Sequence, residues 1–527
     1  MISGKNHIGS KVSSAGQRTF HTFNPKSNKI TGWTFYEASQ AEINEAVDLA
    51  ELAFQEYKQF SGAKKAGFLR AIAEEIENLG DGLIEAYTLE SGLPEGRAIG
   101  ERGRTMGQLN TFASLLEEGS WTDATIDTAI PERTPIPKED IRKILVPIGP
   151  IVVFGSSNFP LAFSTAGGDT ASALAAGCPV IVKSHPMHAG TGELVASAII
   201  KAAKRTGMPN GVFSNLNSSG IEVGQKLVTH PKVKGVGFTG SIHGGKALYN
   251  LGTQRDEPIP VFAEMGSVNP VVILPSALED KKNHWASKYA GSITLGAGQF
   301  CTNPGLLIGL KGKALDSFVA TLGEQLSLLE PSTMLHPNIY ENYEKGRKEI
   351  SSHEKVSVVA MFGEELPPNH GRQQLLTVKE SDFLANPIMH QEVFGPLSLV
   401  VQCTDEEELS KVLHSLEGQL TGTILGDESE VKKYENVVDA LKSRVGRIIF
   451  NSVPTGVEVC PSIFHGGPFP ASTDSRFSSV GTSAIIRWVR PVCFQNWPKS
   501  LLPAELQNEN PLGIMRKVNG KFTSSAI

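Results

Sequence analysis

From Ile151 to Glu264, short apolar runs and helical patterns follow one another in strict alternation. The apolar runs are IVVF, PVIVKS, GVFSNL, VKGVGFTG and IPVFAE, and a stretch with helical spacing separates each from the next. This alternation is typical of a parallel sheet with helices on both faces. The chain is therefore expected to contain a doubly wound α/β domain, with ligands bound beyond the carboxyl ends of its strands.

The rest of the chain is organised around this domain. Ser39 and Glu42 form a capping-box pattern that predicts a helix over 39–60, and a further helical run ends at Gly80, a plausible C-cap. Later strand patterns predict a second α/β region, and two Pro-containing, strand-like segments predict a small β arm. We expect a first domain from residues 1–130 and 151–268, a second from 269–475, an arm from 131–150 and 476–500, and a C-terminal tail over 501–527.

Charge and cysteine usage exclude several classes of protein. Lys and Arg number 49 against 55 Asp and Glu, a net charge of −6, so no basic footprint for nucleic acid is expected. The five cysteines are scattered and form no CxxC pair, which argues against a disulfide framework or a cysteine zinc site. The start of the chain lacks an apolar signal core, and no apolar stretch is long enough to span a bilayer. A cytoplasmic protein without membrane contact is the expectation.

One cysteine occupies an unusual position. Cys301 lies in GQFCTNPG (298–305), between a Gly-rich approach and a Pro-Gly turn, where it is either inert filler or a nucleophile. Four strand ends offer further polar groups at Asn158, Lys183, Gly240/Ser241 and Glu264. The turn GFTGSIHGGK (237–246) exposes backbone N–H groups at a helix start, as phosphate binding requires, but it matches neither GxGxxG nor the P-loop. Alone, it fits an ordinary turn equally well.

Six motifs taken together carry a family resemblance: GSSNFP (155–160), VIVKS (180–184), GFTGS (237–241), FAEMGSVNP (262–270), GQFCTNPG (298–305) and EVFGP (392–396). In this order, over residues 20–495, the chain resembles an NAD(P)-dependent aldehyde dehydrogenase. The resemblance implies a Rossmann-like dinucleotide-binding first domain, a catalytic second domain and an oligomerisation arm, in a homodimer or homotetramer. The stretches starting NFPLAF and GVEVC are more narrowly similar to 2-oxoglutarate semialdehyde (2,5-dioxopentanoate) dehydrogenases, and related fatty-aldehyde enzymes are similar there too.

By this resemblance three residues carry the chemistry. Cys301 is the nucleophile, Glu264 the general base, and Asn158, with the Cys301 N–H, the oxyanion donor. A thiohemiacetal would form, lose hydride to NAD(P)+ and leave a thioester, which Glu264-activated water hydrolyses. No histidine partner is expected, so dipoles, the cofactor or Glu264 should lower the pKa of the thiol. Taken singly, the three also fit an inert thiol, a helix cap and a turn former.

The resemblance also implies a dinucleotide site. The residues expected there are Lys183, Ser184, His185, Gly240, Ser241, Gly245, Glu392 and Phe394. NAD-selective relatives carry a glutamate three residues beyond the lysine, where this chain has Pro186. NADP is therefore the expected cofactor, with NAD also accepted. His185 and His188 lack a further ligand partner, and no metal is expected.

The expected substrate is 2-oxoglutarate semialdehyde, oxidised to 2-oxoglutarate. Arg104 and Gln108 share a helix face, and Arg104 is the expected carboxylate anchor, with Gln108, Phe159 and Ser462 as further substrate contacts. Rival interpretations are a fatty or other aliphatic aldehyde dehydrogenase, a CoA-acylating relative, which usually lacks the Glu264 equivalent, and a non-enzymatic structural relative, which should have lost a catalytic residue.

Overall fold

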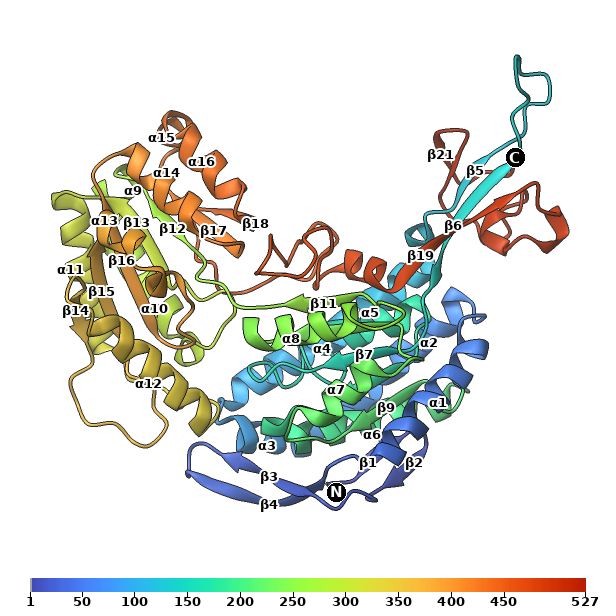
Figure 1. The fold of residues 1–527 in the computed structure, drawn as a ribbon, viewed down its shortest axis with the longest axis horizontal. Coiled ribbons are helices and arrows are strands. Elements are labelled where there is room, and N and C mark those ends of the chain that lie inside the picture. Colours follow the sequence, from blue (N-terminus) through green and yellow to red (C-terminus); the bar gives the residue numbers. More distant parts are fainter. Residues whose placement is uncertain (1) are drawn as a thin grey trace.

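The first lobe is built on a seven-stranded sheet with the order β11-β10-β7-β8-β9-β1-β2 (Figure 1). A computed structural model describes residues 2–527. Five strands are parallel and alternate with helices: β7 (Ile151–Phe154), α5 (Gly168–Ala176), β8 (Val180–Lys183), α6 (Ala189–Arg205), β9 (Phe213–Leu216), α7 (Glu222–Thr229), β10 (Gly235–Thr239), α8 (Ile242–Thr253) and β11 (Val261–Glu264). The predicted doubly wound sheet is confirmed.

The strand order reverses between β7 and β10, which lie side by side. The chain leaves β7 toward β8 on one side and leaves β10 toward β11 on the other, so a crevice opens where the two directions part. Two antiparallel strands complete the edge beyond β9, β1 (Asn6–Ile8) and β2 (Lys11–Ser13). The carboxyl ends of β7, β8, β10 and β11 are therefore gathered at one edge.

A hairpin and four helices precede this unit. They are β3 (Thr19–Asn24), β4 (Lys29–Tyr36), α1 (Gln40–Tyr57), α2 (Gly62–Glu77), α3 (Gly80–Ser91) and α4 (Glu95–Glu118). The Ser39–Glu42 capping box is present at the start of α1. The expected C-cap at Gly80 is wrong: Asn78 caps α2 with its N–H on Glu74, and Gly80, at φ 56°, opens α3 instead. The left-handed glycine serves the turn between two helices.

The second lobe has its own seven-stranded sheet, ordered β14-β15-β16-β13-β12-β17-β18 and parallel except for β14. Its strands are β12 (Val271–Ile273), β13 (Leu306–Leu310), β14 (Ser357–Met361), β15 (Gln374–Lys379), β16 (Leu397–Cys403), β17 (Gln419–Leu425) and β18 (Val445–Phe450). Its helices are α9 (Ser276–Glu279), α10 (Lys282–Thr294), α11 (Lys313–Leu328), α12 (Pro337–Ser351), α13 (Glu380–Ala385), α14 (Glu406–Ser415), α15 (Glu428–Lys433) and α16 (Glu435–Lys442). Two apolar clusters, one on each face, bury this sheet.

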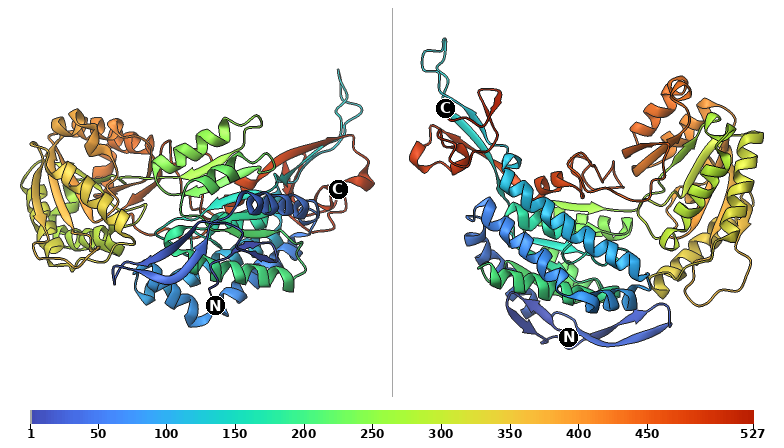
Figure 2. Two further views of the ribbon diagram at one scale, coloured as in Figure 1. Left: turned by 60° about the horizontal axis from the view of Figure 1, so that its bottom comes forward. Right: turned by 180° about the vertical axis from the view of Figure 1, so that it is seen from behind.

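A five-stranded sheet extends away from the first lobe as an arm (Figures 1 and 2). Its order is β19 (Val489–Gln495), β6 (Ile141–Pro147), β5 (Thr125–Asp127), β20 (Arg516–Val518) and β21 (Lys521–Thr523). The arm is wider than expected, because β20 pairs with β5 and brings the expected tail into the sheet. Leu502, Leu506 and Ile514 pack against Ile126 and Ile144 in a small core, which explains why this segment is ordered. The domain boundaries themselves stay predictions.

The connection between β18 and β19 runs from the second lobe back across to the first (Figure 1). Before β19 it forms a 3-10 helix, Thr482–Trp488, where a strand was expected from Ala484. Ala484, Ile485 and Trp488 pack into the core of the first lobe, which the helical spacing allows and an extended strand does not. Within residues 2–527, no helix is long and apolar enough to cross a membrane.

Candidate active site

The turn that carries Cys301 is shaped by three residues with positive φ. Gly296, Ala297 and Gly298 have φ values of 57°, 55° and 67° after the end of α10. A Cβ at Gly298 would lie 2.3 Å from the carbonyl carbon of Gly395, so only glycine permits this approach. The Cys301 turn is thereby pressed against the EVFGP loop, and its side chain remains half-buried.

Asn269 holds the same turn from the other side. Its Nδ2 donates to the carbonyls of Cys301 at 2.8 Å and of Asn303 at 2.9 Å. Its Oδ1 accepts from Thr421 Oγ1 on β17 at 2.8 Å. The backbone of Cys301 is therefore fixed to the second sheet by one buried side chain.

Two N–H donors lie beside Cys301. Asn158, beyond β7, donates one amide hydrogen to the carbonyl of Gln299 at 2.9 Å and has a second amide hydrogen left. Within residues 2–527, the backbone N–H of Cys301 has no acceptor. Both groups are donors of the kind that stabilises the oxygen of an aldehyde once its carbon is bonded to the Cys301 sulfur.

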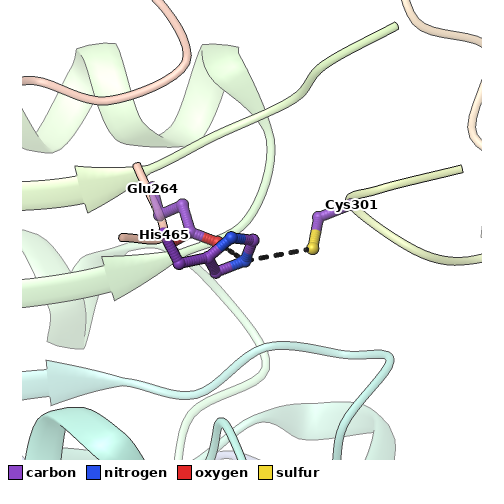
Figure 3. Close-up of side chains that lie close together, drawn as sticks. All are labelled: Glu264, Cys301 and His465. Carbon is purple, nitrogen blue, oxygen red and sulfur yellow. Dashed lines mark hydrogen bonds and ion pairs between the residues drawn. The ribbon is translucent and has the colours of Figure 1, made fainter. Parts of the chain in front are cut away.

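Glu264, at the end of β11 in the first lobe, and His465, in the segment that connects β18 to β19, face Cys301 (Figure 3). His465 Nε2 is 2.9 Å from Glu264 Oε1, an ion-pair distance without the alignment of a full hydrogen bond. The same nitrogen is 3.6 Å from Cys301 Sγ. Ser479 Oγ donates to the other oxygen of the carboxylate, Oε2. One imidazole nitrogen thus touches both the thiol and the carboxylate.

The expectation of a cysteine without a histidine partner is wrong. His465 lies in SIFHGG (462–467), a loop expected near the substrate because of Ser462. The sequence of this loop does not show that the His465 side chain points toward Cys301. Its orientation is set by the loop backbone: His465 N–H donates to Ser478 Oγ at 3.1 Å, and Ser479 N–H donates to the His465 carbonyl at 2.9 Å. Both contacts require residues 478–479 to pack against the 462–467 loop.

The electrostatics differ from expectation as well. Burial, Glu264 and Glu392 raise the pKa of the Cys301 thiol, and only Arg447 and the Cys301 N–H oppose them. Burial also raises the pKa of Glu264, but His465 and Ser479 outweigh it, so this pKa lies below its ordinary value. The thiol is therefore protonated and the carboxylate ionised at neutral pH, and a proton acceptor has to act when the sulfur reacts.

The three ligand atoms of Glu264, Cys301 and His465 lie within 4.8 Å of one another, a spacing that a metal ion can also use. Two ligands on a tetrahedral zinc ion are about 3.3 Å apart, given Zn–N and Zn–O bonds of ~2.0–2.1 Å. The contact of 2.9 Å between His465 and Glu264 is closer than this spacing. That no metal takes part stays a prediction.

The carboxyl ends of β8 and β10 supply groups suited to a dinucleotide. Ser241 caps α8 and accepts from the Gly244 N–H at 3.1 Å, which leaves the first N–H groups of the helix directed outward. A Cβ at Gly245 would lie 2.5 Å from Met265 Sδ, so α8 packs closely on β11. The Gly240 N–H donates to the Glu264 carbonyl at 3.0 Å and ties this turn to the catalytic carboxylate's strand.

Lys183, at the end of β8, has its pKa lowered to about 8 by burial, against the charge of Glu37. Ser184 is buried, and its Oγ has no partner within the described part of the chain, as a group awaiting a ligand hydroxyl or phosphate would. His185 stacks on His188 with ring centroids 4.9 Å apart. These groups fit the ribose side of a dinucleotide.

Glu392 and Phe394 lie across from this edge, on the loop that follows α13. Both line a cavity beside the Cys301 turn, together with Ser267 and Phe300. Burial raises the pKa of Glu392 to about 7, and the Ser267 N–H opposes the rise. Glu392 and Phe394 thus border the Cys301 turn from the second lobe, while in the first lobe Gly240 is tied to Glu264.

The expected substrate residues separate into two groups. Arg104 donates to the Val457 carbonyl at 2.5 Å, and Gln108, one turn further along α4, is buried against Gly168. The Phe159 ring lies 5.4 Å from that of Phe300, next to Cys301. Ser462, in contrast, is exposed and contacts only the thiol of Cys460 among the described residues. The structure brings Phe159 next to Phe300 and Arg104 next to Phe163, both on the Cys301 side, whereas Gln108 packs against Gly168 and Ser462 is directed to solvent.

Comparisons with known proteins agree with this geometry. The model of the aldehyde dehydrogenase family matches residues 11–469. The chain is 46% identical over 521 residues to alpha-ketoglutaric semialdehyde dehydrogenase 2 of Azospirillum brasilense, covering 99% of both chains. It is 44% identical over 523 residues to alpha-ketoglutaric semialdehyde dehydrogenase of Acinetobacter baylyi, again covering 99% of both.

Solved structures share the fold. A betaine aldehyde dehydrogenase point mutant from Staphylococcus aureus, in complex with NAD+, superposes with a TM-score of 0.81 at 19% identity, covering 94% of this chain and 98% of the other. At this identity the likeness shows the three-dimensional arrangement of the lobes and the arm.

Proposed function

The chain belongs to the aldehyde dehydrogenase family, and on that premise we propose that it oxidises 2-oxoglutarate semialdehyde to 2-oxoglutarate with NADP+, or NAD+, as hydride acceptor. The observation that carries the chemistry is the position of His465 Nε2 between Cys301 Sγ and Glu264 Oε1. Two relatives that match almost the full length carry the name of this substrate.

The proton of the thiol has a defined path in this geometry. As the sulfur attacks the aldehyde carbon, Nε2 of His465 accepts the thiol proton and can pass it on to Glu264. The second amide hydrogen of Asn158 and the Cys301 N–H stabilise the oxyanion of the thiohemiacetal. A bound NADP+ or NAD+ supplies the hydride acceptor. Once the thiol proton has been released to solvent, the ionised Glu264 takes a proton from the water that hydrolyses the Cys301 thioester; the leaving sulfur takes a proton back, and the acid is released.

Replacing the nucleophile tests this assignment. Cys301→Ala should abolish turnover and leave cofactor affinity nearly unchanged, because the thiol lies outside the dinucleotide contacts. Cofactor binding is measured by nicotinamide fluorescence, and Cys493→Ala, an exposed thiol on the arm, is the control with full activity. Substantial aldehyde oxidation by Cys301→Ala contradicts the assignment.

Hydrolysis, not transfer to CoA, is the proposed fate of the thioester. Its support is the buried Glu264, which lies within reach of Cys301 through His465. Added CoA should leave the rate of NADPH formation unchanged. A rate that depends on CoA favours the acylating alternative.

The proposed preference for NADP rests on Pro186, which stands where a ribose-chelating glutamate is expected in NAD-selective relatives. Glu37 is the carboxylate that faces Lys183, but Arg18 at 3.3 Å and the Ser219 hydroxyl and N–H already engage it. A 2′-phosphate therefore meets no free carboxylate at Lys183. Dissociation constants for NADPH and NADH, with kcat/KM for both, test this: a tenfold preference for NAD, about 1.4 kcal/mol, contradicts it.

The substrate is tested by comparing kcat/KM for 2-oxoglutarate semialdehyde and for hexanal. Arg104, a half-buried cation whose acceptor is a neutral carbonyl, supports an anionic substrate. A preference for hexanal and longer alkyl aldehydes establishes the fatty-aldehyde alternative.

We also propose that the arm joins copies of the chain into a homodimer or homotetramer. Phe522, Leu501 and Leu512 are exposed on the arm, at 76%, 64% and 50% of their surface. Exposed apolar side chains concentrated on a projecting sheet are typical of an interface. We further propose that the protein is cytoplasmic, that its first domain binds the dinucleotide and that its second domain is catalytic.

A further inference from the structure

Two arginines from different lobes hold one loop beside the active site. Arg104, on α4, donates to the carbonyl of Val457. Arg447, on β18, donates to the carbonyls of Pro454 at 3.0 Å and of Gly456 at 3.2 Å. Because Gly456 and Val457 are consecutive, both guanidinium groups lie on the same short piece of backbone.

Among the residues that the structure describes, neither arginine is in direct contact with a carboxylate. Both side chains are half-buried, and in the described part of the chain neither forms an ion pair with a carboxylate; their hydrogen-bond acceptors are neutral carbonyls. Each also has a buried Nε without an acceptor within residues 2–527. A charge removed from water is costly unless an opposite charge meets it, so the pair is suited to an anion.

A chain of contacts leads from Arg104 to the reacting sulfur: Arg104 Cζ is 5.9 Å from the centroid of the Phe163 ring, that ring is 6.4 Å from the His465 ring, and His465 Nε2 is 3.6 Å from Cys301 Sγ. Burial lowers the pKa of both arginines; Glu101 is the largest opposing group for Arg104, and Cys301 and Glu264 oppose the shift for Arg447. Arg447 in turn acts to lower the pKa of the Cys301 thiol. Glu458 also acts on Arg104, but it is exposed to solvent. Because Arg104 also contacts the 454–457 loop, this loop lies on the side of the site that Phe163 and His465 connect to the sulfur.

We propose that Arg104 and Arg447 together bind the carboxylate of the aldehyde substrate, one from each lobe. The inference rests on the proposed function and deepens it, since it names the groups that select an acid-bearing aldehyde. A carboxylate offers about four lone-pair sites and can accept from both guanidinium groups at once. A carboxylate bound in this way bridges the two lobes and keeps the aldehyde end of the substrate at Cys301. An alkyl aldehyde has no carboxylate, so it leaves both guanidinium charges unpaired.

The test compares two aldehydes that differ only in the acid group, 5-oxopentanoate and pentanal. The ratio of their kcat/KM values should fall roughly 10- to 100-fold in Arg447→Gln and in Arg104→Gln, as for the loss of a hydrogen bond to a charged group. Arg447→Lys should keep part of the ratio, because it keeps the charge. In the double variant the losses should not add, since both residues act on one carboxylate.

Matched controls separate selectivity from folding. Arg444→Gln removes an arginine just before β18 that bonds the His414 carbonyl, and Arg102→Gln removes one on α4 that pairs with Glu77; both should retain the wild-type ratio. A second measurement is the calorimetric affinity of Cys301→Ala for 2-oxoglutarate, which should weaken when Arg447→Gln is added. An unchanged ratio and affinity in Arg447→Gln, or equal losses on both aldehydes, overturn the proposal. If wild type prefers pentanal over 5-oxopentanoate and hexanal over 2-oxoglutarate semialdehyde, the proposed function fails instead.

Discussion

His465 contacts Cys301 and Glu264 through the same ring nitrogen. A histidine that bridges an acid and a nucleophile more often uses one nitrogen for each. Nε2 contacts Cys301 and Glu264, and the other nitrogen, Nδ1, is buried without a partner within residues 2–527. One proton can therefore move from sulfur to carboxylate through one atom. The histidine matters because burial and Glu264 hold the thiol pKa high.

Replacing His465 by Gln should lower kcat/KM by about 10²- to 10⁴-fold, the range for losing a general base. Because the thiol pKa stays raised and its acceptor is gone, the remaining rate should climb with pH as the thiolate fraction grows. The pH profile of kcat/KM and the rate of iodoacetamide alkylation of Cys301 measure this. A variant that keeps the wild-type rate and profile contradicts a role for the histidine.

Glu264 acts on the sulfur in two opposite ways, as the final proton acceptor and as a negative charge that raises the thiol pKa. Glu264→Gln should therefore lower the pH at which Cys301 is alkylated while stalling hydrolysis of the thioester. The expected trace is a burst of reduced cofactor followed by slow turnover, in a stopped-flow experiment. Normal steady-state rates without a burst are incompatible with the base assignment.

At the scale of elements, the Cys301 turn depends on the second sheet. Asn269 joins the carbonyls of Cys301 and Asn303 to Thr421 on β17. The strand β12 that follows Asn269 therefore determines where the nucleophile stands relative to Glu264 on the first sheet.

Asn269→Ala should leave these carbonyls unsatisfied, at a cost of about 1–3 kcal/mol for each buried group. We expect a lower unfolding temperature and a loss of kcat larger than any change in cofactor affinity, because the turn moves and the dinucleotide edge does not. Thermal unfolding and fluorescence titration give the two values. Cofactor affinity that falls as much as kcat would show a general loss of structure instead.

At the scale of the molecule, the arm depends on the last residues of the chain. Leu506 is fully buried in the arm core, and the Arg142 side chain of β6 donates to its carbonyl at 2.6 Å. The edge of the arm is formed by β20 and β21, so residues 501–527 belong to the arm rather than to a loose tail.

Deleting residues 501–527 should expose Ile126 and Ile144 and weaken assembly through the arm. Size-exclusion chromatography with light scattering should show a shift toward monomer or aggregate, while Lys517→Gln, an exposed change on β20, should behave as wild type. An unchanged oligomer after the deletion contradicts the proposed role of the arm.

The local sequence pattern alone predicted the first sheet and several residues of the site. The alternation of strand and helix predicted the first sheet, and the strand ends and the Cys301 turn pointed to Asn158, Lys183 and Glu264, because these features are written in consecutive residues. The tertiary structure alone decided the rest. His465 is 164 positions from Cys301, and Arg447 comes from the far edge of the second sheet. The direction of a loop side chain, and the burial that raises a thiol pKa, exist only once the lobes and the connecting segment have packed together.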